Sequence, residues 1–219
     1  MKSMYEEKGD IYFSGARKIL LDLIPEDIRG GSMLEIGAGD GMNLLYAKEQ
    51  GYANKVYGCE LMKIPGSCQD SDEFEEFIYG NIETIPLNYK KNQFDVIFMG
   101  DVIEHLVNPY ETVEKLKAFL KPNGVFISSI PNARNLKLFR NLFLRGTFKY
   151  YDEGIFDRTH LRFFAKQNIK ELFENAGYEV MTMISDLKYK SCTVAKKNKM
   201  AFGLFEEFLT TQYYTVAKK

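Results

Sequence analysis

The sequence is poor in cysteine and in net charge, and each shortage argues against a class of protein. Its 219 residues include three cysteines, which are widely spaced and odd in number. Neither a disulfide framework nor a zinc site is therefore expected, and the thiols should be reduced. Lysine and arginine together number 29, against 30 acidic residues, so net charge does not imply nucleic acid or a membrane as partner. Charge effects have to be sought in local patches.

Long apolar runs are also missing. The first ten residues, MKSMYEEKGD, lack the apolar core of a signal peptide, and no run approaches the length of a membrane-spanning helix. These features predict a cytoplasmic protein without a transmembrane segment. With 45% hydrophobic residues, the chain can bury a large core, which argues against a solenoid or a disordered chain. A single domain over residues 1–219 is the prediction.

Strand-like and helix-like stretches alternate along most of the chain. Strands are expected at 32–38, 55–60, 94–101 and 124–132, and helices at 15–25, 42–50, 108–120 and 165–177, with a further short helix at 72–77. This alternation predicts an α/β fold with a parallel sheet covered on both faces, and ligands at the carboxyl ends of its strands. The tail differs, because 178–185 and 210–219 resemble strands around a helix at 200–209. We expect them to form a closing hairpin.

Three glycines at alternate positions follow the first strand in the stretch LEIGAGDG, residues 34–41. A dinucleotide-binding loop would need its third glycine three residues after Gly39, where this chain has Met42. Glu35 beside the bend would repel a phosphate and attract a cation. The loop therefore favours a cofactor that carries positive charge and no phosphate.

Further motifs follow in the order typical of one family. VYGCE ends in Glu60, about 20 residues after the glycines, where an acid can accept both hydroxyls of a ribose. GNIE contains Asn81 and Ile82, and FDVIFMGD ends in Gly100 and Asp101. With LEIGAGDG, these segments resemble the class I S-adenosylmethionine-dependent methyltransferases.

The resemblance runs from about residue 12 to the C-terminus. It implies a Rossmann-like, seven-stranded, mostly parallel sheet with an antiparallel C-terminal hairpin, and S-adenosyl-L-methionine as cofactor. Asn81 stands where the family more often has Asp, although an amide carbonyl can still accept from the adenine amino group. The residues expected to bind the cofactor are Glu35, Gly37, Ala38, Gly39, Glu60, Leu61, Asn81, Ile82, Gly100, Asp101, Arg17 and Tyr12, the last two at its methionine carboxylate.

FDRTHLRFF, residues 156–164, resembles a motif in the branch of that family found among sugar, polysaccharide and quinone-biosynthesis enzymes. His160 is the candidate general base, with Asp157 three residues earlier to orient its ring, and His105 as a further catalytic candidate. In some relatives an acid-x-x-Glu-His run helps to bind a divalent metal. Here the run is Asp101, Glu104 and His105, and its first acid is one methylene shorter than in those relatives. On a helix, these three residues could share one face. No metal ligand is assigned: metal binding stays open beside an acid at a helix start with an oriented histidine, or a solvated face.

Residues 131–164 form the irregular region of the chain and contain seven basic and three acidic residues among interleaved leucines and phenylalanines. We predict a cap over the acceptor, basic because the acceptor is anionic. The alternatives are a helical excursion with a solvated basic face and an amphipathic contact with a membrane surface.

The prediction for function is a methyltransferase acting on a hydroxyl oxygen of a small, anionic or sugar-like acceptor, with no nucleic acid as partner. An N-methyltransferase and a quinone or phenol O-methyltransferase are the alternatives within the family. A catalytically silent cofactor-binding scaffold and a nicotinamide-dependent oxidoreductase are the alternatives outside it. The sequence identifies neither the acceptor nor the oligomeric state.

Overall fold

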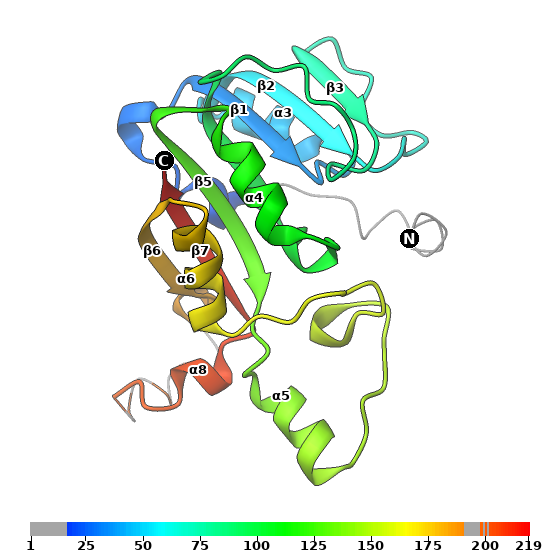
Figure 1. Cartoon of the computed structure of the whole chain (residues 1–219), viewed down its shortest axis with the longest axis vertical. Coiled ribbons are helices and arrows are strands. Elements are labelled where there is room, and N and C mark those ends of the chain that lie inside the picture. The colour runs from blue at the N-terminus through cyan, green and yellow to red at the C-terminus, as the bar shows by residue number, and fades with distance from the viewer. Residues whose placement is uncertain (1–16, 191–197, 199, 201) are drawn as a thin grey trace.

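The computed structural model describes residues 17–190, 198, 200 and 202–219. Its centre is a seven-stranded sheet in the order β3-β2-β1-β4-β5-β7-β6 (Figure 1). The strands are β1 (Gly31–Ile36), β2 (Ala53–Glu60), β3 (Glu76–Tyr79), β4 (Phe94–Gly100), β5 (Leu120–Pro131), β6 (Glu179–Ser185) and β7 (Gln212–Lys218). The predicted Rossmann-like fold is confirmed, including the antiparallel pairing of β7 with both β5 and β6.

The chain changes direction across the sheet between β1 and β4. From β1 it adds β2 and β3 on one side, and then returns to place β4 on the other side of β1. Met33 pairs with Val96 and Leu34 with Ile97 in this parallel contact. The strand order reverses at this point, so the loops after β1 and β4 diverge and leave a crevice at the carboxyl ends of the strands.

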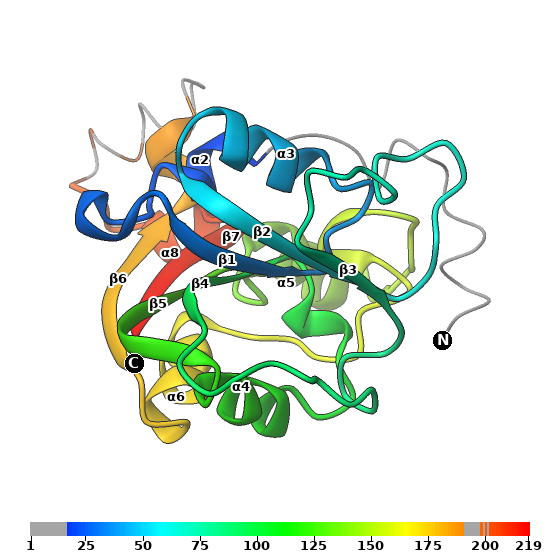
Figure 2. The same ribbon diagram turned by 90° about the horizontal axis from the view of Figure 1, so that it is seen from above.

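Helices cover both faces of the sheet. Figure 2 shows α2 (Lys18–Leu21) and α3 (Met42–Glu49) on one side, and α4 (Pro109–Lys117) and α6 (Lys166–Asn175) on the other. Each layer buries its own apolar cluster, with Leu44 and Phe98 on the first side and Leu116 and Phe173 on the second. The strands read as continuous apolar runs because both of their faces are buried.

An excursion leaves the sheet after β5, at the lower end of Figure 1. It contains α5 (Leu136–Phe139), which continues as a π-helical turn (Arg140–Leu144), and a 3-10 turn (Gly154–Phe156). It returns beside its starting point, where Asn132 forms a bridge with Phe164. The region from 131 to 164 that the sequence singled out is thus one inserted segment. We call it the cap, the role predicted for it.

Some local expectations were wrong. Residues 72–75 form turns and then enter β3 at Glu76, so the helix expected at 72–77 does not form. The helix expected at 15–25 is, among the described residues, only the four residues of α2, and that expected at 200–209 is α8 (Glu206–Leu209). Further 3-10 turns occupy Glu26–Ile28, Ile103–His105 and Asp186–Tyr189. Tyr12 and Cys192 lie outside the described residues.

Candidate functional site

A cavity of about 1150 Å³ lies at the carboxyl ends of the strands, between the sheet and the cap. Every predicted site residue within the described part of the chain lines it: Arg17, Glu35, Gly37, Ala38, Gly39, Glu60, Leu61, Asn81, Ile82, Gly100, Asp101, His105, Asp157 and His160. Tyr12 is the exception, because it lies outside that part. The fold thus brings segments from six parts of the chain to one place.

The glycine loop after β1 needs glycine for conformation and for space. Gly37 and Gly39 have φ angles of 72° and 55°, in the left-handed region that side chains disfavour. A Cβ atom on Gly37 would lie 2.3 Å from Cγ2 of Val102, in the loop after β4. The Val102 side chain therefore packs directly against the backbone at Gly37, and any side chain at this position would displace it.

Glu35 is the buried acid at the end of β1. Asn43 donates from Nδ2 to Glu35 Oε1 at 2.9 Å and accepts at Oδ1 from the backbone N–H of Arg17 at 2.7 Å. The second oxygen, Oε2, has no hydrogen-bond partner among the described residues. Burial raises the pKa of this carboxyl to about 8, although the charge of Arg17 opposes the rise. A positively charged ligand group beside Glu35 would therefore stabilise its ionised carboxylate.

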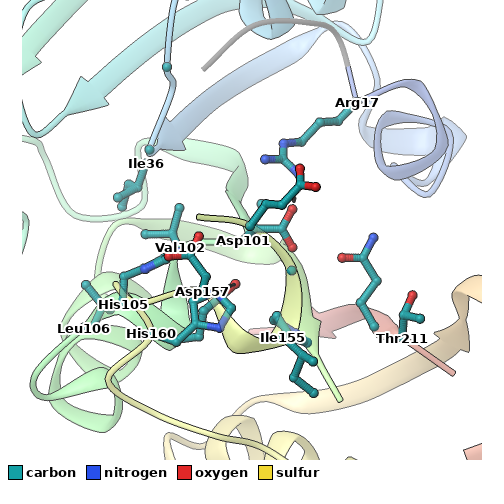
Figure 3. Close-up of a pocket in the computed structure, with 18 of the residues that line it drawn as sticks. Arg17, Ile36, Asp101, Val102, His105, Leu106, Ile155, Asp157, His160 and Thr211 are labelled. Atoms are coloured by element: carbon teal, nitrogen blue, oxygen red, sulfur yellow. Dashed lines mark hydrogen bonds and ion pairs between the residues drawn. The ribbon is translucent and has the colours of Figure 1, made fainter. Parts of the chain in front are cut away.

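Arg17 and Asp101 form an ion pair across the crevice, and Figure 3 shows them side by side. Asp101 also accepts at Oδ1 from the Ser129 hydroxyl at 2.7 Å. Its φ of 54° places it before the 3-10 turn at 103–105 and not on a helix with Glu104 and His105. The shared helical face expected for these three residues is therefore wrong, because the chain bends at Asp101.

Glu60, at the end of β2, holds the glycine loop. Its Oε2 accepts from the backbone N–H of Gly39 at 2.8 Å, and its Oε1 from that of Leu61 at 2.6 Å. Burial raises the pKa of this carboxyl, while the two backbone bonds favour its charged form. Asn81 lies further along the same wall and accepts at Oδ1 from the backbone N–H of Glu83 at 3.0 Å. The acid and the amide thus line the cavity with acceptor atoms fixed by backbone contacts.

Glu104, His105 and His160 form a buried cluster in the site. Each offers a ligand atom, and these atoms lie within 4.8 Å of one another. Glu104 Oε1 is 3.8 Å from His160 Nε2, and neither oxygen of this buried carboxylate has a hydrogen-bond partner among the described residues. Burial, and then the charge of Asp101, raise the pKa of Glu104 well above its usual range. Figure 3 shows both histidines in the same corner as Asp157.

The FDRTHLRFF segment attaches the cap to the loop after β4. The backbone N–H groups of Leu161 and Arg162 donate to the carbonyl of Glu104 at 2.9 and 3.0 Å. The Thr159 carbonyl lies 3.0 Å from Nδ1 of His105. This contact fixes the orientation of the ring and engages Nδ1 rather than Nε2. These contacts hold together two segments that are more than 50 positions apart in the chain.

Asp157 is buried and belongs to a turn with Thr159. Its Oδ1 accepts from the Thr159 N–H at 2.9 Å and from the Thr159 hydroxyl at 2.7 Å, and its carbonyl accepts from the N–H of His160. The carboxylate thus fixes the backbone that carries His160. Whether it also orients the imidazole, as predicted, stays a prediction.

The helical part of the cap gives the cavity a basic wall. Lys137, Arg140 and Arg145 line it, with Asn141 among them. Glu153 and Asp157, further along the cap, also line the cavity, and the sheet side carries Glu35, Glu60, Asp101 and Glu104. One cavity therefore has an acidic wall suited to a cationic ligand and a basic wall suited to an anionic one.

Sequence reasoning missed two residues that organise the acidic wall. Asn43 connects Glu35 with the Arg17 backbone, and Ser129 holds Asp101. The signal for Asn43 was a polar residue at the buried start of a helix, directly after the glycines. Ser129 gave no such signal, because a serine in a buried strand is common.

Comparison with known proteins gives one family. The family described as "Methyltransferase domain" matches residues 10–183. A curated relative, the mitochondrial ubiquinone biosynthesis O-methyltransferase of Dictyostelium discoideum, is 29% identical over 117 aligned residues. The alignment covers 47% of this chain and 36% of the relative, so the chain spans about a third of that relative's length.

Solved structures share the fold. An S-adenosylmethionine-dependent methyltransferase from Mesorhizobium loti aligns with a TM-score of 0.63 at 13% identity, covering 92% of this chain and 96% of that one. The 1,6-didemethyltoxoflavin-N1-methyltransferase of Burkholderia thailandensis, solved with bound 1,6-didemethyltoxoflavin and S-adenosylhomocysteine, aligns with a TM-score of 0.61 at 15% identity. That alignment covers all of this chain and 81% of the other.

Proposed function

This chain belongs to the methyltransferase-domain family, and we propose that it is an enzyme that uses S-adenosylmethionine to methylate a hydroxyl oxygen of a small, anionic or sugar-like acceptor. The observation that carries the proposal is the division of one cavity into an acidic wall, a basic wall and a histidine corner between them. A cationic methyl donor, an anionic acceptor and a proton acceptor would each have a chemically matched region.

The acidic wall fits the cofactor in charge and in shape. Glu35, with its second oxygen lacking a hydrogen bond, would receive the ammonium of the methionine end, and Glu60 the ribose hydroxyls. Asn81 and Ile82 would contact the adenine. Arg17 would bind the methionine carboxylate while it also contacts Asp101.

At the acceptor, the chemistry needs alignment and removal of one proton. S-adenosylmethionine supplies an electrophilic methyl group, and its sulfonium becomes a neutral thioether as the C–S bond breaks and the new C–O bond forms. His160 would take the hydroxyl proton, because imidazole titrates near neutral pH. Asp157 and Thr159 would hold the backbone of His160 in place, and His105 would pack against its ring, 4.7 Å between centroids.

A second role for the same corner is supported by its donor set. Two imidazoles and one buried carboxylate are suitable ligands for a divalent cation. The carboxylate, that of Glu104, has no hydrogen-bond partner among the described residues. Glu104, His105 and His160 would hold it. Such a cation would polarise the acceptor hydroxyl, and His160 would then be a ligand and not the base. Excess chelator separates the two roles: activity that survives it leaves His160 as base, and activity that returns only with added Mg²⁺ or Mn²⁺ favours the cation.

The basic wall supports an anionic acceptor. Lys137, Arg140 and Arg145 line the cavity from the cap, whereas the residues proposed for the cofactor line it from the sheet. The D. discoideum relative is an O-methyltransferase by name, which fits transfer to oxygen. The B. thailandensis neighbour is an N1-methyltransferase by name, so transfer to nitrogen is the alternative that the test must exclude. The cytoplasmic location stays a prediction from sequence.

The test is transfer of labelled methyl from S-adenosylmethionine to fractionated extract of the source organism, followed by mass spectrometry of the labelled species. We expect an O-methylated small molecule with a phosphate or carboxylate group. A labelled amine, or a labelled neutral compound that is not a sugar, would contradict the proposed acceptor. Absence of any labelled product, together with a melting temperature raised by S-adenosylhomocysteine, would favour a silent binding scaffold. NAD should leave the melting temperature unchanged.

A further inference from the structure

The helical part of the cap exposes large apolar side chains to solvent. Along α5 and the π-helical turn, five leucines and phenylalanines are 41–72% exposed: Leu136, Phe139, Leu142, Phe143 and Leu144. Phe139 and Phe143 stack on each other, 5.0 Å between ring centroids, and so form one continuous surface. We call these five residues the apolar face of the cap.

The polar side of the same helix faces inward. Lys137, Arg140, Asn141 and Arg145 line the cavity, whereas none of the five residues of the apolar face does so. A surface helix of a globular protein normally has the opposite arrangement, with its apolar side toward the core. This helix is therefore inverted, and its apolar face needs a partner outside the protein to leave water.

Charge on the cap indicates which partner. Residues 131–151 contain five basic side chains, Arg134, Lys137, Arg140, Arg145 and Lys149, and not a single Asp or Glu. Arg134 forms an ion pair with Glu207, and Lys137, Arg140 and Arg145 lie on the cavity side of the helix, so the segment keeps an excess of positive charge. Leucine and phenylalanine on one face of a helix with lysine and arginine around them are the features of helices that lie in a membrane interface. An anionic lipid surface would attract the whole segment. A second copy of this chain would bring five more like charges against it, which disfavours self-association through the cap.

We propose that the cap docks on an anionic lipid bilayer through its apolar face. The contact is peripheral, since no helix of the described residues is long and apolar enough to cross a membrane. Figure 1 shows α5 at the end of the molecule, beyond the carboxyl end of β5, where a flat surface can reach it. The inference does not depend on which acceptor is methylated.

The experiment is sedimentation of the full chain with two kinds of vesicle, phosphatidylcholine alone and phosphatidylcholine mixed equally with phosphatidylglycerol. The test variant is Phe143→Ser/Leu144→Ser, which removes the two most exposed side chains of the apolar face and none that lines the cavity. Lys149→Gln removes one charge outside the cavity. Met181→Ser is the matched control, because Met181 is 55% exposed on β6 and is not part of the apolar face. The shift in melting temperature with S-adenosylhomocysteine checks that each variant folds.

Wild type and Met181→Ser should sediment with the anionic vesicles and not with phosphatidylcholine alone. The double variant should bind the anionic vesicles about tenfold more weakly or worse, and Lys149→Gln by a few-fold, with unchanged response to S-adenosylhomocysteine. Failure of wild type to bind anionic vesicles would overturn the proposal, as would equal binding by the double variant. A wild-type dimer in light scattering that the double variant dissociates, without vesicle binding, would assign the face to a second copy instead.

Discussion

Glu35→Gln is the most informative single change, because it should stabilise the protein and weaken cofactor binding at the same time. In the fold, Glu35 is buried, and its pKa is raised from 4.5 to about 8. Between these two values the folded protein keeps the carboxyl neutral, while the unfolded chain ionises it. The stability that the raised pKa contributes is complete below 4.5 and is lost as pH rises toward 8.

The size of the effect follows from the shift. Each pH unit between 4.5 and 8 costs wild type about 1.4 kcal/mol of unfolding free energy relative to a side chain that does not titrate. From pH 5.5 to 7.5 the advantage of the glutamine variant should therefore grow by roughly 2 to 3 kcal/mol. For a domain of this size, that is on the order of 5 to 10 °C in melting temperature.

The assay is thermal unfolding of wild type and Glu35→Gln from pH 5.5 to 8, without ligand. Glu49→Gln, at the exposed end of α3, is the matched loss of one carboxylate and should differ from wild type by a constant small amount. Parallel curves for wild type and Glu35→Gln would mean that Glu35 is already ionised beside Arg17. That result would refute the reasoning from burial.

Cofactor binding should respond in the opposite direction. A ligand ammonium needs the ionised carboxylate, so the affinity of wild type for S-adenosylhomocysteine should rise between pH 6 and 8, and calorimetry should detect release of a proton. Glu35→Gln should bind about 10- to 100-fold more weakly at pH 8, with a flat pH profile. Full affinity of the variant would place the ammonium elsewhere.

Four further results are expected. Gly39→Val should abolish S-adenosylhomocysteine binding, because its φ of 55° and the acidic wall of the cavity exclude a branched side chain. Gly51→Val, also at positive φ but with open space around it, should bind normally. Equal binding by both variants would refute the placement of the loop. Glu60→Gln should weaken binding about tenfold or more, since a carboxylate that serves the Gly39 amide and the ribose is lost, and a twofold change in calorimetry would contradict this. His160→Ala should retain affinity for S-adenosylhomocysteine but slow single-turnover transfer by roughly 10²- to 10⁴-fold, with partial recovery at high pH; a rate within a few-fold of wild type would exclude it as base. If Glu104 holds a cation, the methyl-transfer rate of the Glu104→Gln variant should not respond to chelator. A Mg²⁺ or Mn²⁺ titration of the variant against wild type measures this, and identical titrations would remove the cation from the proposal.

The sequence by itself determined the sheet and the residues of the acidic wall. Apolar runs of strand length, broken by glycines and ended by acids, fix both the strands and the residues at their carboxyl ends, because these are local properties of the backbone. Glu35, Gly39 and Glu60 could therefore be identified before any contact was known. Local pattern also misled, since the acidic stretch 72–77 was expected to be a helix but runs through turns into the edge strand β3.

Only the tertiary structure decided how the acceptor side is assembled. The contact of His105 with the Thr159 carbonyl joins positions 54 apart, and the Arg17–Asp101 ion pair joins positions 84 apart. Such contacts cannot be predicted from local sequence, because they depend on where the cap returns to the sheet. The same holds for the inverted helix: its leucines and arginines were visible in the sequence, but which of them face the cavity depends on the direction in which the chain leaves β5.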